Sequence, residues 1–309
     1  MAAPTILVTG ATGKQGSAAI NALLAVSTPF SILAVTRNPS SPAAQALAAK
    51  SPLIKLVPGN LDDVPNLFSD ALQINNNTPI WGVFAVLTSL GPGVTPASEI
   101  SQGKALIDGA KKAGVKFFVY SSVERGGDEA SWENSTPIPH FQTKLVLEKY
   151  LRDNAGEMEW CVLRPVAFMD NLEPGMKTAV FMAALRNWLG KERKLQWVAT
   201  RDIGVFAAMA FEKKDEWKGR AVGITGDELN MEELALAFRR ATGKEAPAAW
   251  WGLGSLLTAV ASELRAMIGW FSTGGYRANV EKRRAEHSGL LTMEQWLIKE
   301  SKFVSRDQQ

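Results

Sequence analysis

A glycine-rich segment near the start of the chain has the residue types and spacing of a phosphate-binding loop. The segment Thr9-Gly-Ala-Thr-Gly-Lys-Gln-Gly16 follows a short apolar run and leads into an alanine-rich stretch. The first glycine can adopt the positive φ of a tight turn, the second admits a pyrophosphate, and the third allows close helix–strand contact. A helix N-terminus there would offer N–H groups and partial positive charge to a phosphate. We assign to this dinucleotide site the residues Gly10, Thr12, Gly13, Lys14, Gln15 and Gly16.

The end of the next apolar run favours NADP(H) over NAD. Sites for NAD usually present a carboxylate at this point, which binds the ribose 2′-hydroxyl. Here Thr36 is followed by Arg37 and Asn38, and no acidic residue is nearby. A guanidinium group is planar and suits a phosphate, and Lys14 could approach the same group. We therefore predict NADP(H) as the cofactor, with Arg37 and Asn38 among the residues that bind it.

The first half of the chain alternates short apolar runs with longer segments of helical periodicity, such as Ser98–Ala113 and Pro139–Asn154. Continuous apolar runs are typical of strands that are covered on both faces. The alternation therefore predicts an α/β fold, a Rossmann-type doubly wound parallel sheet. In such sheets, ligands bind where the strands end and the winding reverses. The six runs are Thr5–Thr9, Ser31–Thr36, Ile54–Val57, Ile80–Leu87, Val115–Tyr120 and Glu159–Leu163.

After Pro165 helices dominate the pattern, and the strand-like pieces are Leu195–Val198 and Ala221–Thr225. We expect Asp202 and Asn230 to cap two of the helices. The helical segments are Met176–Leu189, Asp202–Lys213, Met231–Thr242, Leu256–Phe271 and Met293–Lys302. The predicted organisation is a Rossmann domain over residues 1–165, with 200–226 returning to the sheet, and a smaller, mostly helical substrate-binding region over 166–199 and 227–309.

Composition restricts the class of protein. The chain has 309 residues, 46% of them hydrophobic and 21% charged, which is sufficient for a large core and excludes wholesale disorder. The 34 Lys and Arg against 31 Asp and Glu leave a net charge of +3 without a basic tract, so nucleic-acid binding is not expected. The single cysteine, Cys161, fits a reducing compartment. The first residues lack a basic region before an apolar core, so we expect a cytoplasmic protein.

An uncharged, tryptophan-containing segment runs from Ala246 to Ser262. Pro247, Gly252 and Gly254 interrupt it, whereas a membrane-spanning helix needs about 20 mostly apolar residues. We expect a helix packed on protein and no membrane partner. The aromatic residues in and after this segment could line an apolar pocket for a planar substrate, or could belong to the core. They are Trp250, Trp251, Trp270 and Phe271.

Segments spread along almost the whole chain carry a family resemblance. They are Thr9–Gly16, Val35–Pro39, Pro58–Asp63, Pro139–Lys144, Leu163–Asn171 and Leu291–Trp296. These segments resemble the NmrA-like family, which belongs to the atypical branch of the short-chain dehydrogenase/reductase superfamily. The family includes NADP-binding redox-sensing regulators without evident catalysis, and reductases that act on quinones and other small molecules. The resemblance implies the fold and the cofactor and leaves the activity open.

The resemblance also implies further cofactor contacts by position. Asn60 and Leu61 would flank the adenine, although relatives commonly carry aspartate where Asn60 stands; asparagine can still bond an amino group. The other implied contacts lie at the ends of predicted strands: Leu87 and Thr88 for the ribose and phosphates, and Pro165, Val166, Ala167 and Phe168 for the nicotinamide.

The usual proton donor of short-chain reductases is absent. These enzymes use a tyrosine followed four residues later by a lysine, on one face of a helix. None of the three tyrosines, Tyr120, Tyr150 and Tyr276, has a lysine at that spacing. His140 stands in the equivalent place, with Lys144 four residues on. The resemblance implies that Lys144 bonds the nicotinamide ribose.

The remaining candidates each have a structural alternative. His140 can donate a proton near neutral pH, or can serve only at a helix end. Ser121 and Ser122 could orient a substrate oxygen or begin a loop, and Gly126–Glu129 is expected to be a flexible loop. His287 lies in the charged stretch Glu281–His287, which is typical of a solvated helix face. Two distant histidines and one cysteine do not form a ligand cluster, so no metal is predicted.

The leading hypothesis is an NADPH-dependent reductase of a small apolar or aromatic compound, of the quinone, enone or imine type. Hydride would transfer directly from the nicotinamide, and His140, Lys144 or solvent would supply a proton. One alternative is a non-catalytic NADP(H)/NADP⁺ redox sensor that regulates a protein partner. Another is a cofactor-dependent isomerase or cyclisation catalyst. The sequence predicts neither the substrate nor the oligomeric state.

Overall fold

The computed structural model describes residues 3–91, 93–190, 192–248 and 262–304. These residues divide into two compact units. Unit 1 comprises Met1–Ser122, Thr143–Arg164 and Ile203–Val222, and unit 2 comprises Val123–Gln142, Pro165–Asp202 and Gly223–Gln309.

A seven-stranded sheet lies mostly in unit 1 and forms its centre. Its strands are β1 (Thr5–Val8), β2 (Ser31–Thr36), β3 (Ile54–Pro58), β4 (Gly82–Ala85), β5 (Phe117–Ser121), β6 (Glu159–Pro165) and β9 (Ala221–Ile224). They lie in the order β3-β2-β1-β4-β5-β6-β9, and the pairings from β3 to β6 are parallel. The winding reverses between β1 and β4, as in other doubly wound sheets. The predicted α/β fold is confirmed.

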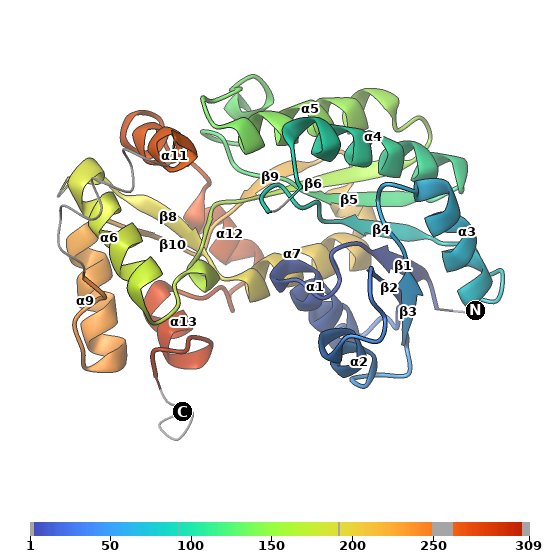
Figure 1. Ribbon diagram of the computed structural model, residues 1–309, viewed down its shortest axis with the longest axis horizontal. Helices are drawn as coiled ribbons and strands as arrows, with labels where there is room; N and C mark the ends of the chain where they lie inside the picture. The colour runs from blue at the N-terminus through green and yellow to red at the C-terminus, as the bar shows by residue number, and fades with distance from the viewer. Residues whose placement is uncertain (1–2, 92, 191, 249–261, 305–309) are drawn as a thin grey trace. The chain divides into compact units, whose positions relative to one another are not determined.

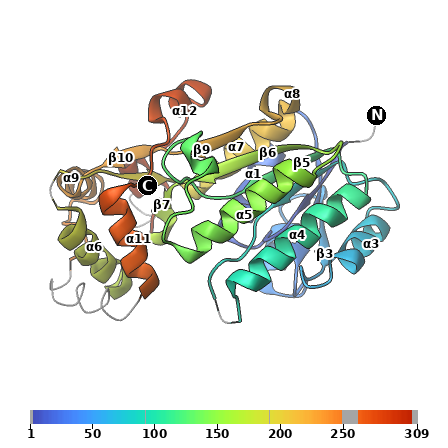
Figure 2. The same cartoon turned by 90° about the horizontal axis from the view of Figure 1, so that it is seen from above.

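Helices cover both faces of this sheet. They are α1 (Lys14–Ala25), α2 (Pro42–Ala48), α3 (Val64–Ile74), α4 (Pro96–Lys112), α5 (Pro139–Asn154), α7 (Thr200–Glu212) and the short α8 (Lys214–Trp217). Helices α3, α4 and α5 lie on one face, and α1 and α7 lie on the other (Figures 1 and 2). Contact between α7 and α1 is close, because a Cβ on Gly204 would lie 2.4 Å from the Ala18 backbone.

The core of unit 1 explains why its strands are mostly apolar. Side chains from the sheet and from α3, α4 and α5 form one buried cluster. It includes Leu7, Val83 and Phe118 from the sheet, Leu67 from α3, Leu106 from α4 and Leu147 from α5. A strand that is covered on the opposite face as well has no position open to water, so it carries no polar alternation.

Unit 2 contains a small sheet in the order β10-β8-β7. Strand β8 (Leu195–Val198) pairs antiparallel with β10 (Asp227–Leu229) and parallel with β7 (Ala167–Phe168). The helices are α6 (Met176–Leu189), α9 (Met231–Thr242), α11 (Ser262–Thr273), α12 (Val280–Glu286) and α13 (Met293–Lys299), with 3₁₀ turns at Ala130–Trp132 and Met169–Asn171. Helix α13 packs on α9, and α11 packs on α6.

One of the two predicted helix caps is correct. Asn230 precedes α9, and its side chain accepts the N–H groups of Glu232 and Glu233. The prediction for Asp202 is wrong, because α7 already begins at Thr200, whose N–H and hydroxyl donate to Asp170 (2.8 and 2.6 Å). Asp202 lies inside the first turn.

The structure bears on two other predictions about unit 2. The stretch Glu281–His287 is only partly a solvated helix face, because Arg283 on α12 is 1% exposed. Of the predicted helix Leu256–Phe271, residues 256–261 lie outside the described residues, as do Trp250 and Trp251. Among the helices that are described, none combines the length and the hydropathy that crossing a bilayer requires.

Candidate functional site

The glycine loop joins β1 to α1 and is anchored to the segment after β4. The Thr9 hydroxyl donates to the carbonyl of Val86 (2.9 Å) and accepts the N–H of the same residue (2.8 Å). Gly10 has a φ of +59°, in the region that favours glycine. A Cβ on Gly16 would lie 2.2 Å from the carbonyl oxygen of Gly10, so no other residue fits at that position without moving the loop.

The first turn of α1 is suited to an anion. Gly13 is the N-cap residue, no side chain caps the helix, and the first turn contains no acidic residue. The first N–H groups of an α-helix lack partners within the helix, and its dipole favours negative charge there. Thr12, Gly13 and Lys14 are exposed. The loop and the helix therefore fit the pyrophosphate of a dinucleotide.

Gln15 connects this loop to the end of β5. Its Oε1 accepts the hydroxyl of Ser121 at 2.6 Å, and the neighbouring Ser122 hydroxyl donates to Glu148. Both serines that the sequence suggested for orienting a substrate oxygen are thus bonded to protein side chains. Of the two alternatives for them, these contacts favour structural roles.

Arg37 follows β2 and is exposed. Its guanidinium makes no hydrogen bond or ion pair with any residue that the structure describes. Asn38 shapes the turn after the strand, because its Oδ1 accepts the N–H of Ser40 at 3.0 Å. No carboxylate stands at the end of β2. The donors of Arg37 are therefore available for a phosphate group.

Asn60 and Leu61 have local roles in the structure. The Asn60 amide donates to the carboxylate of Asp62 (2.7 Å), which also accepts the amide of Gln102 (2.7 Å). The hydrogen bonds from Gln102 and then Asn60 lower the pKa of Asp62. Leu61 is half-buried and packs against the core of unit 1. An adenine contact by either side chain remains a prediction.

Leu87 and Thr88 face different environments. Leu87 is 6% exposed and belongs to the core cluster, whereas Thr88 is exposed. Leu87 therefore packs inside unit 1, and Thr88 is the one of the pair that is open to a ligand.

Lys144 is bound by a buried carboxylate. Its ammonium lies 2.7 Å from Oε1 of Glu99, which is on α4, and 5.5 Å from the ring centroid of Tyr120. Glu99 also accepts the hydroxyls of Ser89 (2.7 Å) and Thr143 (2.6 Å). Sequence reasoning missed Glu99. The sequence signal was the capping residue Thr95, which starts α4 and places Glu99 in its first turn.

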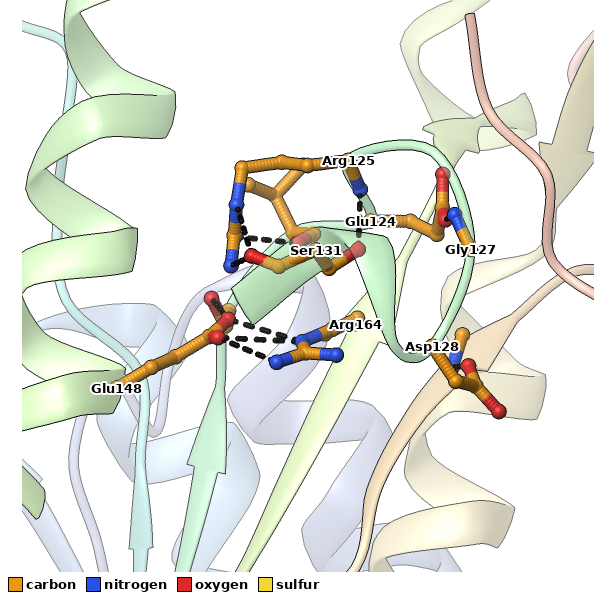
Figure 3. Close-up of polar contacts among 10 residues, drawn as sticks. Glu124, Arg125, Gly127, Asp128, Ser131, Glu148 and Arg164 are labelled. Carbon is orange, nitrogen blue, oxygen red and sulfur yellow. Dashed lines mark hydrogen bonds and ion pairs between the residues drawn. The ribbon is translucent and has the colours of Figure 1, made fainter. Parts of the chain in front are cut away.

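A second buried ion pair lies one turn further along α5. Glu148 and Arg164 are both fully buried, and Nη2 of Arg164 lies 2.7 Å from Oε2 of Glu148 (Figure 3). The Arg164 Nε donates to the same carboxylate at 3.2 Å. This pair joins α5 to β6 within unit 1.

The remaining predicted site residues belong to unit 2. His140 is half-buried, and its ring stands edge-on to that of Phe141, with centroids 4.8 Å apart. Pro165 and Val166 are buried, and the Val166 N–H donates to Ile224 (3.2 Å). Ala167 and Phe168 are half-buried in β7. The glycine loop, Arg37 and Lys144 lie in unit 1, and the cofactor contacts of these unit 2 residues stay predictions.

Trp270 and Phe271 belong to a packed aromatic cluster rather than to an open wall. Trp270 lies 5.5 Å from Phe141 and 5.3 Å from Tyr276, measured between ring centroids, and Phe271 lies 5.2 Å from Tyr276. All four rings are at most 9% exposed. For Trp270 and Phe271 the structure favours the core alternative over a substrate pocket.

Sequence reasoning also missed the order of the loop after β5. Glu124 is fully buried and accepts the N–H groups of Gly126 and Arg277 (both 3.0 Å) and of Gly127. Arg125 donates to the carbonyl of Ser131 at 2.7 Å (Figure 3). Burial raises the pKa of Glu124, and the three backbone hydrogen bonds oppose that shift. The loop Gly126–Glu129, which the sequence predicted to be flexible, is therefore held by hydrogen bonds at both ends.

A cavity of about 450 Å³ lies at the opposite edge of the sheet in unit 1. Phe30, Trp81 and Phe211 form its aromatic wall, and the charged stretch 212–216 forms its rim. Phe30 and Trp81 each precede a strand, so the cavity is at the amino ends of the strands. It contains none of the predicted site residues, and parallel sheets bind ligands at the carboxyl ends.

The sequence is similar to those of a known protein family. The model of the NmrA-like family matches residues 2–297. Two fungal proteins named NmrA-like family domain-containing oxidoreductases are similar: hkm9 of Aspergillus hancockii (29% identity, 80% of this chain and 75% of that protein) and ptmS of Penicillium ochrochloron (30% identity, 78% and 73%).

Two solved structures are similar in fold. NmrA, a negative transcriptional regulator in complex with NADP, has a TM-score of 0.70 at 21% identity, covering 96% of this chain and 95% of that one. NADPH-dependent quinone oxidoreductase QOR2 from Escherichia coli, complexed with NADPH, has a TM-score of 0.70 at 21% identity, covering 94% and 98%. The family match spans the sheet, the glycine loop and most of unit 2, and the chain belongs to the NmrA-like family.

Proposed function

We propose that this chain is an NADPH-dependent reductase of a small apolar or aromatic compound, of the quinone, enone or imine type. The observation that carries the cofactor assignment is the exposed Arg37, which has no partner within the described ranges and follows a strand that ends without a carboxylate. A 2′-phosphate would give its guanidinium a charged acceptor. The names of the NmrA-like oxidoreductases and of the quinone oxidoreductase support the reaction class.

Different residues of unit 1 would bind different parts of the dinucleotide. The Gly10–Gly16 loop and the first turn of α1 would hold the pyrophosphate, Arg37 would hold the 2′-phosphate, and Lys144 would bond a ribose hydroxyl. Thr88 and the backbone around Val86 are the candidates for the central part of the dinucleotide. When bound, the nicotinamide supplies the hydride. We assign substrate binding to residues 166–199 and 227–309.

The proton is assigned to His140, Lys144 or solvent. His140 is half-buried and its ring is oriented by the edge-on contact with Phe141. An imidazole can donate a proton near neutral pH, whereas quinone reduction can also take protons from water. A His140→Gln variant separates these routes. Loss of turnover with unchanged NADPH affinity assigns the proton to His140, and unchanged turnover assigns it to another source.

The reductase proposal is tested by following NADPH oxidation at 340 nm with a panel of quinones, enones and imines. We expect turnover with at least one class, and much less turnover with NADH at equal concentration. Binding of NADPH without turnover across the whole panel would contradict the reductase and leave the cofactor assignment intact.

A second candidate is a non-catalytic sensor of the NADP(H)/NADP⁺ ratio that acts on a protein partner. The observation that favours it is the engagement of both serines after β5, together with the absence of a tyrosine–lysine pair. A sensor must distinguish the two redox states in affinity or conformation. Equal dissociation constants for NADPH and NADP⁺, with identical proteolysis patterns, would exclude this candidate.

A further inference from the structure

The carboxylate of Glu99 bonds to three side chains from two segments of unit 1. Its Oε1 accepts the hydroxyl of Ser89, in the segment after β4, and the ammonium of Lys144, on α5 (2.7 Å each). Its Oε2 accepts the hydroxyl of Thr143 at 2.6 Å. Glu99 is only 1% exposed. Three protein groups therefore bond to this buried carboxylate.

The position of Glu99 on α4 is fixed by the start of that helix. Thr95 is the N-cap residue, and its hydroxyl accepts the N–H of Ser98 (3.1 Å) while Ser98 accepts the N–H of Thr95 (2.9 Å). This reciprocal pair holds the first turn, in which Glu99 lies. The first turn of a helix also favours a negative charge. The carboxylate is thus held both by its backbone and by its electrostatic surroundings.

The ammonium of Lys144 has donors left after these contacts. Lysine carries three N–H donors, and within the described part of the chain Glu99 is its one hydrogen-bonding acceptor. The face of the Tyr120 ring lies within the range of a cation–π contact. Lys144 is buried but keeps 7% of its surface exposed. At least one donor is available to a ligand.

We propose that Glu99 is a positioning residue for the dinucleotide, acting through Lys144. The carboxylate fixes the ammonium near Tyr120, at the end of β5, so that one of its remaining donors is presented to a ribose hydroxyl. This inference rests on the proposed function, in which Lys144 binds that ribose. Without Glu99, the flexible lysine side chain has no acceptor to hold it in one orientation, and ordering it would cost free energy when the dinucleotide binds.

A double-mutant cycle tests this inference. The four proteins are the wild type, Glu99→Gln, Lys144→Met and the double variant, each titrated with NADPH by fluorescence. Glutamine keeps the size of the side chain and removes the charge, and one of the two hydroxyls, that of Ser89 or Thr143, would accept from the amide group instead of donating. We expect Glu99→Gln to weaken NADPH binding about 5- to 20-fold, since bonds to charged groups are worth about 1.5–3 kcal/mol and only part of that is lost.

The cycle separates positioning from a merely structural role. If Glu99 acts through Lys144, Glu99→Gln has no effect beyond about twofold in the Lys144→Met background. A structural role predicts the same weakening in both backgrounds, and that result would overturn the inference. An unchanged NADPH affinity in Lys144→Met would overturn it as well. Failure of the wild type to bind NADPH would instead overturn the proposed function.

Asp108 provides a matched control on the same helix. Its carboxylate also joins α4 to α5, by accepting the hydroxyl of Tyr150 at 2.8 Å, but it is far along the helix from Glu99 and does not contact Lys144. Asp108→Asn should leave the NADPH affinity within twofold of wild type. Weakening by Asp108→Asn equal to that by Glu99→Gln would show that any loosening of α4 against α5 suffices, which would contradict the positioning role.

Discussion

Replacing Arg37 with alanine should weaken NADPH binding and leave NADH binding nearly unchanged. The side chain is exposed and bonds to no described residue, so its removal breaks no contact within the fold. Bonds to a charged group are worth about 1.5–3 kcal/mol, and exposure to solvent lowers that value. We therefore expect a loss of about 1–2 kcal/mol, which is about 5- to 30-fold in the dissociation constant.

Calorimetric titration at two salt concentrations measures this loss. Raising the ionic strength screens an exposed charge pair, so the factor between wild type and Arg37→Ala should shrink as salt increases. Arg37→Lys is the graded control, because it keeps the charge and loses the planar fork. Its affinity for NADPH should fall between those of wild type and Arg37→Ala. Urea unfolding should show a stability change within about 0.5 kcal/mol, as for other surface substitutions.

Equal weakening of NADPH and NADH by Arg37→Ala would refute the reasoning. Such a result would mean that the guanidinium binds a chemical group that NADPH and NADH share, or that it stabilises the glycine loop. A drop in folding stability of several kcal/mol would also refute it, because this side chain has no partner to lose among the residues that the structure describes.

Three further predictions concern folding and the loop. Gly16→Ala should weaken NADPH binding at least tenfold, because its Cβ would lie 2.2 Å from the Gly10 carbonyl oxygen. Gly269→Ala, whose Cβ would meet no described atom within 4 Å, should leave it unchanged, and titration with NADPH compares the two variants. Arg164→Met should lower the free energy of unfolding by about 3–5 kcal/mol in urea, because it removes the charged partner of the buried Glu148 carboxylate; a loss under 1 kcal/mol would contradict this. Burial raises the pKa of the Glu124 carboxyl above its ordinary 4.5, so the folded state binds that proton more tightly than the unfolded state. The free energy of unfolding of wild type should therefore increase relative to that of Glu124→Gln as the pH falls from 7 toward 4.5. A difference between the two proteins that does not change with pH would contradict this.

The sheet could be predicted from sequence because most positions of its strands are apolar, since helices cover the sheet on both faces. Strand β2 has the predicted bounds Ser31–Thr36. The run Ile80–Leu87 is longer than β4, which spans Gly82–Ala85, because Ile80 and Leu87 are apolar for burial in the core and not for pairing in the sheet. Hydrophobicity therefore locates a strand better than it locates the ends of the strand.

The start of α4 shows how local chemistry sets a boundary that periodicity misses. The apolar pattern predicts a helix from Ser98, whereas α4 begins at Pro96, directly after its cap Thr95. Proline is favoured in the first helical turn, because its missing N–H would have no partner there. Strand β7 has only two residues, which is too short for any periodicity to appear.

The candidate site could be predicted only where one continuous segment forms it. The glycine loop and Arg37 each carry their function within a few adjacent residues. The contact of Glu99 with Lys144 joins two helices that are 45 positions apart in sequence, and no spacing rule links them. Glu124 is held by backbone N–H groups, which carry no residue type that a sequence could reveal.

The most direct test of the central claim is a calorimetric titration of the wild-type chain with NADPH and with NADH in the same buffer. A glycine loop that fits a pyrophosphate, together with a guanidinium that bonds to no described residue, predicts saturable binding of both nucleotides, with NADPH at least tenfold tighter at low salt. Equal dissociation constants would contradict the role of Arg37, and no heat with either nucleotide would contradict the dinucleotide site itself.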